Sequence, residues 1–257
     1  MDLSALTRKF LYYPDRLPVD LPPPRWAGDA EEVWMECPDG VRIHGLWWNE
    51  PTGAPVILFL HGNAQEVYSW SLVREDLAPL GTRMLLIDYH GYGKSGGSPS
   101  ERALYLDGET ALAWLRERGV AEEDVIVFGK SLGGAVACHL ARGRRFRALI
   151  LESTFTSLKA VARKLFPFLP ESAPLGEEYR SIEKIGTTMS PVLVIHGDAD
   201  ELIPVEEGIR LYEAAPHPKD LYLVRGAGHN DVSIVAGGEY PKRIARFLED
   251  HPAKASQ

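Results

Sequence analysis

Cysteine is scarce in this chain, which has two, Cys37 and Cys138, among 257 residues. Two such distant cysteines do not make the disulfide framework of a small secreted domain, and the apolar surroundings of Cys138 favour a small buried side chain. We therefore expect a reducing environment. The 257 residues show no compositional break, so a single domain spanning residues 1–257 is predicted, with 1–30 as an N-terminal arm that is proline-rich from Pro14 to Pro24.

An excess of positive charge is also lacking, because 28 Lys and Arg stand against 36 Asp and Glu, giving a net charge of −8. This balance argues against nucleic acid as a partner, and the one basic cluster, Arg142–Arg147, is interpreted as a solvated turn. The first 24 residues contain neither a long apolar run nor a signal-peptide cleavage site, which predicts a cytoplasmic protein without a membrane anchor. The eight histidines show no paired metal-ligand spacing, so neither a metal nor a cofactor is expected.

Apolar runs of strand length alternate with amphipathic segments along most of the chain. A hairpin is predicted at Glu32–Glu36 and Val41–Trp48, around the turn signal of Pro38–Gly40. Strands are then expected at residues 55–62, 84–91, 125–129, 148–154, 191–197 and 221–229, and helices at 66–80, 101–118, after 131, at 205–215 and around 234–248. This alternation predicts an α/β fold with a mostly parallel sheet covered by helices on both faces.

The segment VIVFGKSLGGAVA contains a serine between two closely spaced glycines, Gly129 and Gly133. A strand that turns directly into a helix at Ser131 is the nucleophile elbow, which holds a serine hydroxyl clear of the backbone. A second match to the same pattern surrounds Ser95, but the Gly-Gly-Ser-Pro that follows it cannot begin a helix. Ser131 is therefore the predicted nucleophile and Ser95 a loop residue.

A serine nucleophile requires a histidine base and an acid that orients it. His229 follows the last predicted strand in a glycine-rich loop, and Asp200 follows the strand before it, in HGDADELIP. The order Ser131, Asp200, His229 is the order found in α/β hydrolases. Three other acids stay open as alternatives to Asp200: Asp198, Glu201 and Glu152.

Two backbone amides are expected to stabilise the oxyanion of a tetrahedral intermediate. Leu132 begins the elbow helix and offers one of them, and the other is expected from Asn63, in the HGNA loop after the strand at 55–62. His61, in the same loop, is interpreted as a structural hydrogen-bonding residue.

The connection at residues 155–189 is about twice as long as an ordinary strand-to-helix connection. Its apolar residues suggest a short helical lid over the site, and the alternative is a crossover helix packed on the sheet. The tentative substrate-binding residues of this lid are Leu158, Val161, Leu165 and Phe166.

The ordered blocks HGNA, DYHGYGKSGGSPSE, GKSLGGAVA, ESTFTS, HGDADELIP and GAGHND, between about Val41 and Leu248, resemble the α/β-hydrolase superfamily. The similarity is greatest to its bud-emergence-type branch of small serine hydrolases. It implies Ser131, Asp200 and His229 as a catalytic triad, with the amides of Asn63 and Leu132 as the oxyanion hole.

The sequence therefore predicts a serine hydrolase whose partner is a small-molecule ester or thioester, with amide or peptide hydrolysis as the alternative. A catalytically silent hydrolase fold that binds a ligand is a second alternative. Dinucleotide binding is disfavoured, because Pro99 and Ser100 precede the helix that would have to begin within Gly91–Gly96. Activity is expected to fall as histidine becomes protonated, near its ordinary pKa of about 6.5. The oligomeric state is not indicated.

Overall fold

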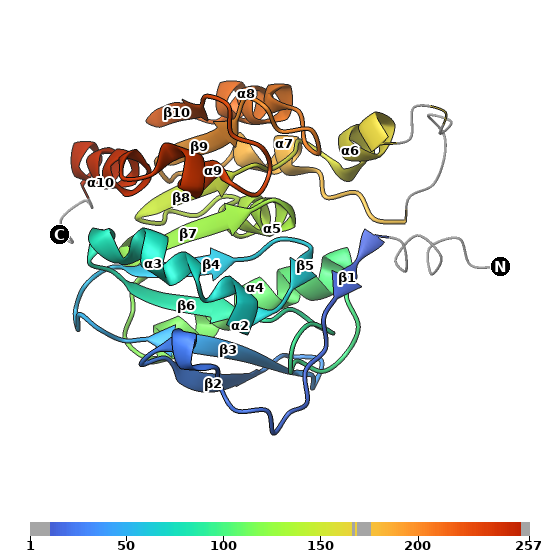
Figure 1. The fold of residues 1–257 in the computed structure, drawn as a ribbon, viewed down its shortest axis with the longest axis vertical. Coiled ribbons are helices and arrows are strands. Elements are labelled where there is room, and N and C mark those ends of the chain that lie inside the picture. The colour runs from blue at the N-terminus through green and yellow to red at the C-terminus, as the bar shows by residue number, and fades with distance from the viewer. Residues whose placement is uncertain (1–10, 166–167, 169–175, 253–257) are drawn as a thin grey trace.

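The structure is a computed structural model that describes residues 11–165, 168 and 176–252. Its centre is an eight-stranded sheet in the order β10-β9-β8-β7-β4-β6-β3-β2 (Figure 1). β3 is antiparallel to β2 and β6, and the other neighbouring pairs are parallel. The strands are β2 (Glu31–Glu36), β3 (Arg42–Trp48), β4 (Val56–Leu60), β6 (Arg83–Ile87), β7 (Val125–Lys130), β8 (Ala148–Glu152), β9 (Val192–Gly197) and β10 (Lys219–Val224). The predicted mostly parallel α/β sheet is confirmed.

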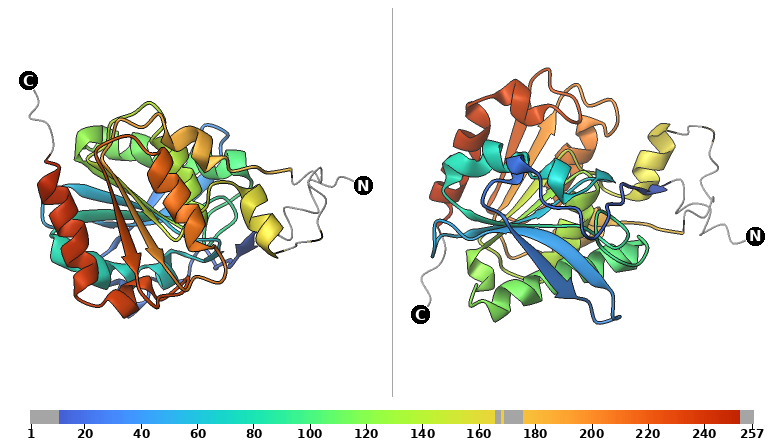
Figure 2. Two further views of the ribbon diagram at one scale, coloured as in Figure 1. Left: turned by 90° about the horizontal axis from the view of Figure 1, so that it is seen from above. Right: turned by 60° about the horizontal axis from the view of Figure 1, so that its bottom comes forward.

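Helices cover both faces of this sheet (Figure 2). On one face lie α4 (Glu101–Glu117), α5 (Leu132–Leu140), α7 (Ser181–Ile185) and α8 (Val205–Ala214). On the other lie α2 (Val67–Trp70), α3 (Val73–Leu77), α9 (Val232–Ala236) and α10 (Glu239–Asp250). The shorter elements are β1 (Tyr13–Pro14), β5 (Ala64–Gln65), η1 (Arg25–Ala27), η2 (Ala78–Leu80), η3 (Glu122–Asp124) and α6 (Leu158–Leu165).

Alternate residues of the central strands supply two separate apolar layers. In β4, Val56, Leu58 and Leu60 belong to the layer that contains α4 and α5. Ile57 and Phe59 belong to the layer that contains α3 and α10. This two-residue period explains why a strand buried on both faces is apolar throughout its length.

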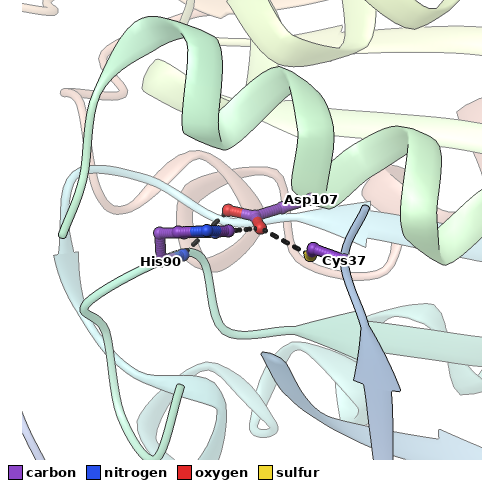
Figure 3. A group of neighbouring side chains, drawn as sticks. All are labelled: Cys37, His90 and Asp107. Carbon is purple, nitrogen blue, oxygen red and sulfur yellow. Dashed lines mark hydrogen bonds and ion pairs between the residues drawn. The ribbon is translucent and has the colours of Figure 1, made fainter. Parts of the chain in front are cut away.

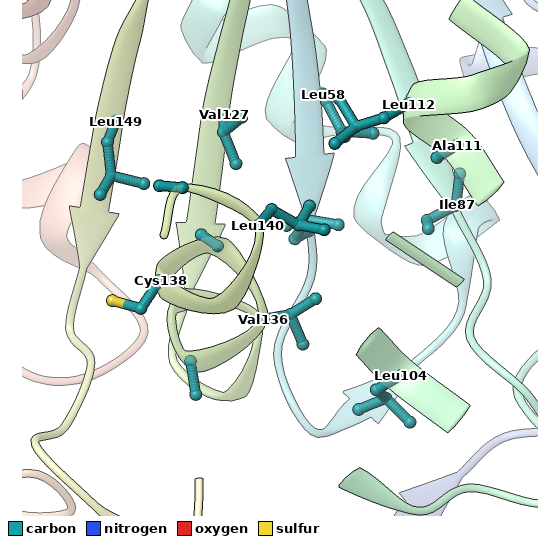
Figure 4. Packing of buried hydrophobic residues seen from close by; sticks show 14 of the residues in the cluster. Leu58, Ile87, Leu104, Ala111, Leu112, Val127, Val136, Cys138, Leu140 and Leu149 are labelled. Atoms are coloured by element: carbon teal, nitrogen blue, oxygen red, sulfur yellow. The ribbon is translucent and has the colours of Figure 1, made fainter. Parts of the chain in front are cut away.

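The apolar side of α5 packs against the sheet along the middle and the end of the helix. Figure 4 shows Val136 and Leu140 of α5 packed between the strands and α4, near Leu58 and Leu104. These four side chains are fully buried, and each such burial contributes about 2 kcal/mol of hydrophobic free energy. This burial fastens α5, which follows β7 after the single residue Ser131, to the sheet.

Three predicted elements differ from the structure in their extent. The helix predicted at 66–80 is divided into α2, α3 and η2: the first division lies at Ser71, whose hydroxyl donates to the Tyr68 carbonyl at 2.7 Å, and η2 contains Pro79. The last helix is interrupted by Gly237, whose φ of 53° is left-handed. The last strand ends at Val224, so His229 lies on a loop.

Of the described part of the N-terminal arm, β1 lies at the carboxyl-end edge of the sheet, where it pairs with β5 (Figure 1). Within the described ranges, no helix has both the length and the apolar character required to cross a membrane.

Candidate active site

Ser131 occupies a sharp turn between β7 and α5, as the glycine spacing predicts. Its φ of 53° is left-handed, which is uncommon for a residue with a side chain. A Cβ at Gly133 would lie 1.9 Å from the Leu60 carbonyl oxygen, and one at Gly129 would lie 2.4 Å from the Gly133 oxygen. The turn can therefore form only if both flanking positions are glycine.

Ser131, His229 and Asp200 form a continuous hydrogen-bonded chain. His229 Nε2 lies 3.1 Å from Ser131 Oγ, and His229 Nδ1 lies 2.8 Å from Asp200 Oδ2. With the proton on Nδ1, the imidazole donates to the carboxylate and its Nε2 can accept the serine proton. The three residues follow β7, β9 and β10, so parallel strands bring them to one edge of the sheet.

The Asp200 carboxylate is fixed by backbone as well as side-chain donors. Its Oδ1 accepts hydrogen bonds from the amides of Leu202 at 2.9 Å and Ile203 at 2.8 Å. Burial acts to raise the pKa of Asp200, but hydrogen bonds from His196 and His229 outweigh it and hold this pKa below its usual range. Asp200 is therefore ionised at neutral pH and presents a negative charge to His229.

His196 is a contact of Asp200 that the sequence analysis did not identify. This fully buried side chain on β9 places Nε2 2.9 Å from the Ile203 carbonyl and 3.4 Å from Asp200 Oδ2. Gly208 leaves room for the ring, since a Cβ there would lie 2.5 Å from His196 Nδ1. A polar residue at the end of an otherwise apolar strand was the available signal.

The three alternative acids lie in other environments. Asp198 accepts a hydrogen bond from the Gly226 amide at 2.6 Å, and Glu201 is exposed. Glu152 pairs with Lys130 at 2.7 Å and accepts a hydrogen bond from Tyr240. Of the four candidates, Asp200 is the one that hydrogen-bonds to His229.

The loop after β4 adjoins the nucleophile. A Cβ at Gly62 would lie 3.6 Å from the Ser131 Cβ, so the backbone next to Asn63 passes close to the serine. Leu132 is the first residue of α5, and an amide in this position has no acceptor within its own helix. The two amides expected to form an oxyanion hole thus belong to segments on either side of Ser131.

His61 contributes to the structure of this loop. It is fully buried, and its Nδ1 lies 2.7 Å from the Gly62 carbonyl. Burial lowers the pKa of His61 to about 4, which keeps the ring neutral. The second serine of the elbow pattern, Ser95, is also buried, and its hydroxyl donates to the Asp88 carbonyl at 2.8 Å.

The predicted lid is described in part. Leu158 is buried and Val161 packs against the core, whereas Leu165 is 46% exposed. Phe166 lies outside the described residues. The lid therefore stays a prediction, and the inner end of α6 packs as a crossover helix would.

Cys37, His90 and Asp107 form a buried cluster of ligand-type side chains on the hairpin side of the sheet (Figure 3). Asp107 Oδ1 lies 2.5 Å from His90 Nδ1 and 3.6 Å from Cys37 Sγ, and Oδ2 accepts the His90 amide at 2.8 Å. His90 Nε2 lies 3.2 Å from Asp39. Protein hydrogen bonds thus account for the cluster, which fastens the loop after β6. The expectation that no metal or cofactor is needed stays a prediction.

Comparisons with known proteins identify the family to which this chain belongs. Residues 55–175 match the family described as the alpha/beta hydrolase fold. An uncharacterized protein of Mycobacterium tuberculosis is 38% identical over 97% of this chain and 90% of its own length. The human alpha/beta hydrolase domain-containing protein 17B is 37% identical over 86% of this chain and 76% of its own length.

Among solved structures, the Pyrococcus furiosus esterase Pf2001 superposes with a TM-score of 0.75 at 24% sequence identity, covering 93% of this chain and 99% of the esterase chain. At this identity the likeness establishes the fold. Together with the sequence relatives, it shows that this chain belongs to the α/β-hydrolase fold family.

Proposed function

We propose that this protein is a serine hydrolase that cleaves carboxylic esters or thioesters through an acyl-enzyme on Ser131. The observation that carries the proposal is the hydrogen-bonded chain from Ser131 through His229 to Asp200. The Pyrococcus protein that shares the fold is an esterase, which supports the proposal at the level of reaction class.

In the first half of the proposed reaction, Ser131 Oγ attacks the substrate carbonyl carbon while His229 Nε2 takes the hydroxyl proton. The carbonyl oxygen becomes an oxyanion that accepts hydrogen bonds from the amides of Asn63 and Leu132. His229 then gives its proton to the departing alcohol or thiol, and the acyl group stays on Ser131.

In the second half, His229 takes a proton from water, and the resulting hydroxide attacks the acyl carbon. Collapse of this second intermediate releases the carboxylic acid and returns the proton to Ser131 Oγ. Asp200 remains ionised throughout and stabilises the imidazolium that forms in each half. Esters and thioesters are favoured over amides because their leaving groups need less help from an acid.

The test is the intact-protein mass after treatment with a fluorophosphonate, for the parent, Ser131→Ala and Ser95→Ala. An adduct on the parent and on Ser95→Ala, lost in Ser131→Ala, is expected. A series of p-nitrophenyl esters and matched thioesters and anilides then compares the leaving groups. A parent that forms no adduct and hydrolyses none of these substrates would support the ligand-binding alternative.

A further inference from the structure

The segment Leu11–Leu17, here called the N-terminal strap, is bound to two loops at the carboxyl end of the sheet: the loop after β4, which adjoins Ser131, and the loop after β6. Tyr13 and Pro14 pair in register with Ala64 and Gln65 of the loop after β4. Further along, the Gly93 amide donates to the Asp15 carbonyl at 2.7 Å and the Leu17 amide donates to the Gly93 carbonyl at 2.9 Å. The strap therefore joins the loop after β4 to the loop after β6.

Asn63 lies where these contacts converge. Its side-chain Nδ2 donates to the Leu11 carbonyl at 2.5 Å. From the other side, the Tyr92 hydroxyl contacts Asn63 Oδ1 at 2.9 Å and the Asn63 carbonyl at 3.0 Å. The side chain is thus held at both ends, which leaves the orientation of the Asn63 peptide little freedom.

The loop itself has a conformation that needs such support. Gln65 has a φ of 69°, in the left-handed region that non-glycine residues rarely occupy. Strained backbone of this kind persists where the surroundings impose it. Here Gln65 is paired with Pro14, so the strap supplies part of that constraint.

We propose that the strap and Tyr92 together position the oxyanion hole, because both hold the Asn63 side chain, the strap through the Leu11 carbonyl and Tyr92 through its hydroxyl. The inference rests on the proposed hydrolase function, in which the Asn63 amide must point at the oxyanion before the oxyanion forms. A strap that merely covers the surface would contribute to stability alone. A strap that positions the Asn63 amide would stabilise the transition state more than the bound substrate.

The kinetic test compares Tyr92→Phe with Tyr105→Phe. Each removes a hydroxyl, and the Tyr105 hydroxyl is bonded to Glu101 and Lys184, neither of which belongs to the strap or to the loop after β4. For Tyr92→Phe we expect kcat on a p-nitrophenyl ester to fall roughly ten- to a hundredfold, with KM nearly unchanged. The affinity for a trifluoromethyl ketone, which forms a tetrahedral adduct on the serine, should weaken by the same factor as kcat/KM.

Tyr105→Phe should retain the parent kcat. Equal losses in the two variants, or an unchanged kcat in Tyr92→Phe, would refute the positioning role. Asn63→Ala keeps the backbone amide but removes the side-chain bonds to Leu11 and Tyr92. If the two residues act together, the fold-reduction in kcat of the double variant should be smaller than the product of the two single reductions. Independent, multiplicative losses would count against a shared action.

Hydrogen exchange separates failure of this inference from failure of the proposed function. Amides of residues 61–66 should exchange faster in Tyr92→Phe than in the parent, whereas those of α5 should not change. This measurement needs no activity. If the parent proves inactive, the proposed function fails, but hydrogen exchange still tests whether the loop is held in place. Unchanged exchange of residues 61–66 in Tyr92→Phe would overturn the proposed positioning of the loop.

Discussion

At the scale of single residues, the site depends on how firmly Asp200 is held in its ionised form. Two backbone amides bind Oδ1, and His229 and His196 approach Oδ2. Because the pKa of Asp200 is lowered in the folded state, its ionisation stabilises the fold above the ordinary aspartate pKa of about 4. That contribution is lost as the pH falls through the lowered pKa. Protonation of Asp200 should therefore not contribute to a loss of activity in mild acid.

Asp200→Asn should reduce kcat by about 10⁴-fold, because an amide does not hold the histidine in the tautomer that accepts the serine proton. Asp198→Asn is the matched control, since Asp198 accepts a hydrogen bond from the Gly226 amide, whereas Asp200 is the acid bonded to His229. Steady-state kinetics on one ester checks both. If Asp198→Asn were the more damaging substitution, the assignment of the acid would be wrong.

At the scale of elements, the junction of β7 and α5 works because three glycines let backbones approach closely. A Cβ at Gly134 would lie 2.3 Å from Thr154 Oγ1, in addition to the conflicts at Gly129 and Gly133. The close approach places the first turn of α5 directly against β4. The position of Ser131 and the packing of α5 are therefore consequences of the same steric requirement.

Gly133→Ala should destabilise the protein by about 1–3 kcal/mol or more, since the conflicting atoms are backbone carbonyls that cannot rotate away. The free energy of unfolding from urea titration measures this. Gly238→Ala is the control, because a Cβ there meets nothing within 4 Å and its φ is −61°. Its effect should stay within about 1 kcal/mol. Similar losses at both positions would show that the junction is not sterically limited.

At the scale of the whole molecule, a polar network ties the antiparallel strands to the parallel part of the sheet. His44 of β3 contacts Asp88, after β6, at 3.0 Å and Glu32 of β2 at 2.9 Å. Glu32 also accepts hydrogen bonds from Lys94 and Tyr68. Desolvation acts to raise the pKa of Glu32, but these hydrogen bonds outweigh it and lower the pKa.

Glu32→Gln should lower the free energy of unfolding at pH 7 by about 1 kcal/mol, a modest value because Glu32 is partly exposed. The lowered pKa stabilises the fold above the unfolded-state value, so the difference from the parent should shrink as acid protonates Glu32. Urea unfolding at pH 7 and pH 3.5 tests this. Glu31→Gln, on the same strand but exposed, should match the parent at both pH values. A difference that grows in acid would contradict the sign.

The sequence by itself determined the features that depend on short-range rules. The glycine spacing around Ser131 imposes the elbow through local sterics, and apolar runs of strand length, alternating with amphipathic segments, predict which segments form the sheet and its cover. The division of the predicted helix at Ser71 was missed because neither glycine nor proline marks it within an otherwise amphipathic segment.

Tertiary structure alone decided the features that require contacts between distant residues. The sequence favours Asp200 but leaves Asp198 and Glu201 open, and the path of the loop after β9 brings Asp200 to a histidine 29 residues away. The contact of His196 with Asp200 follows from the same loop path. The bond between Asn63 and Leu11 spans 52 residues. No local pattern encodes such a contact, because it exists only after the strands have assembled and the loops at their carboxyl ends have met.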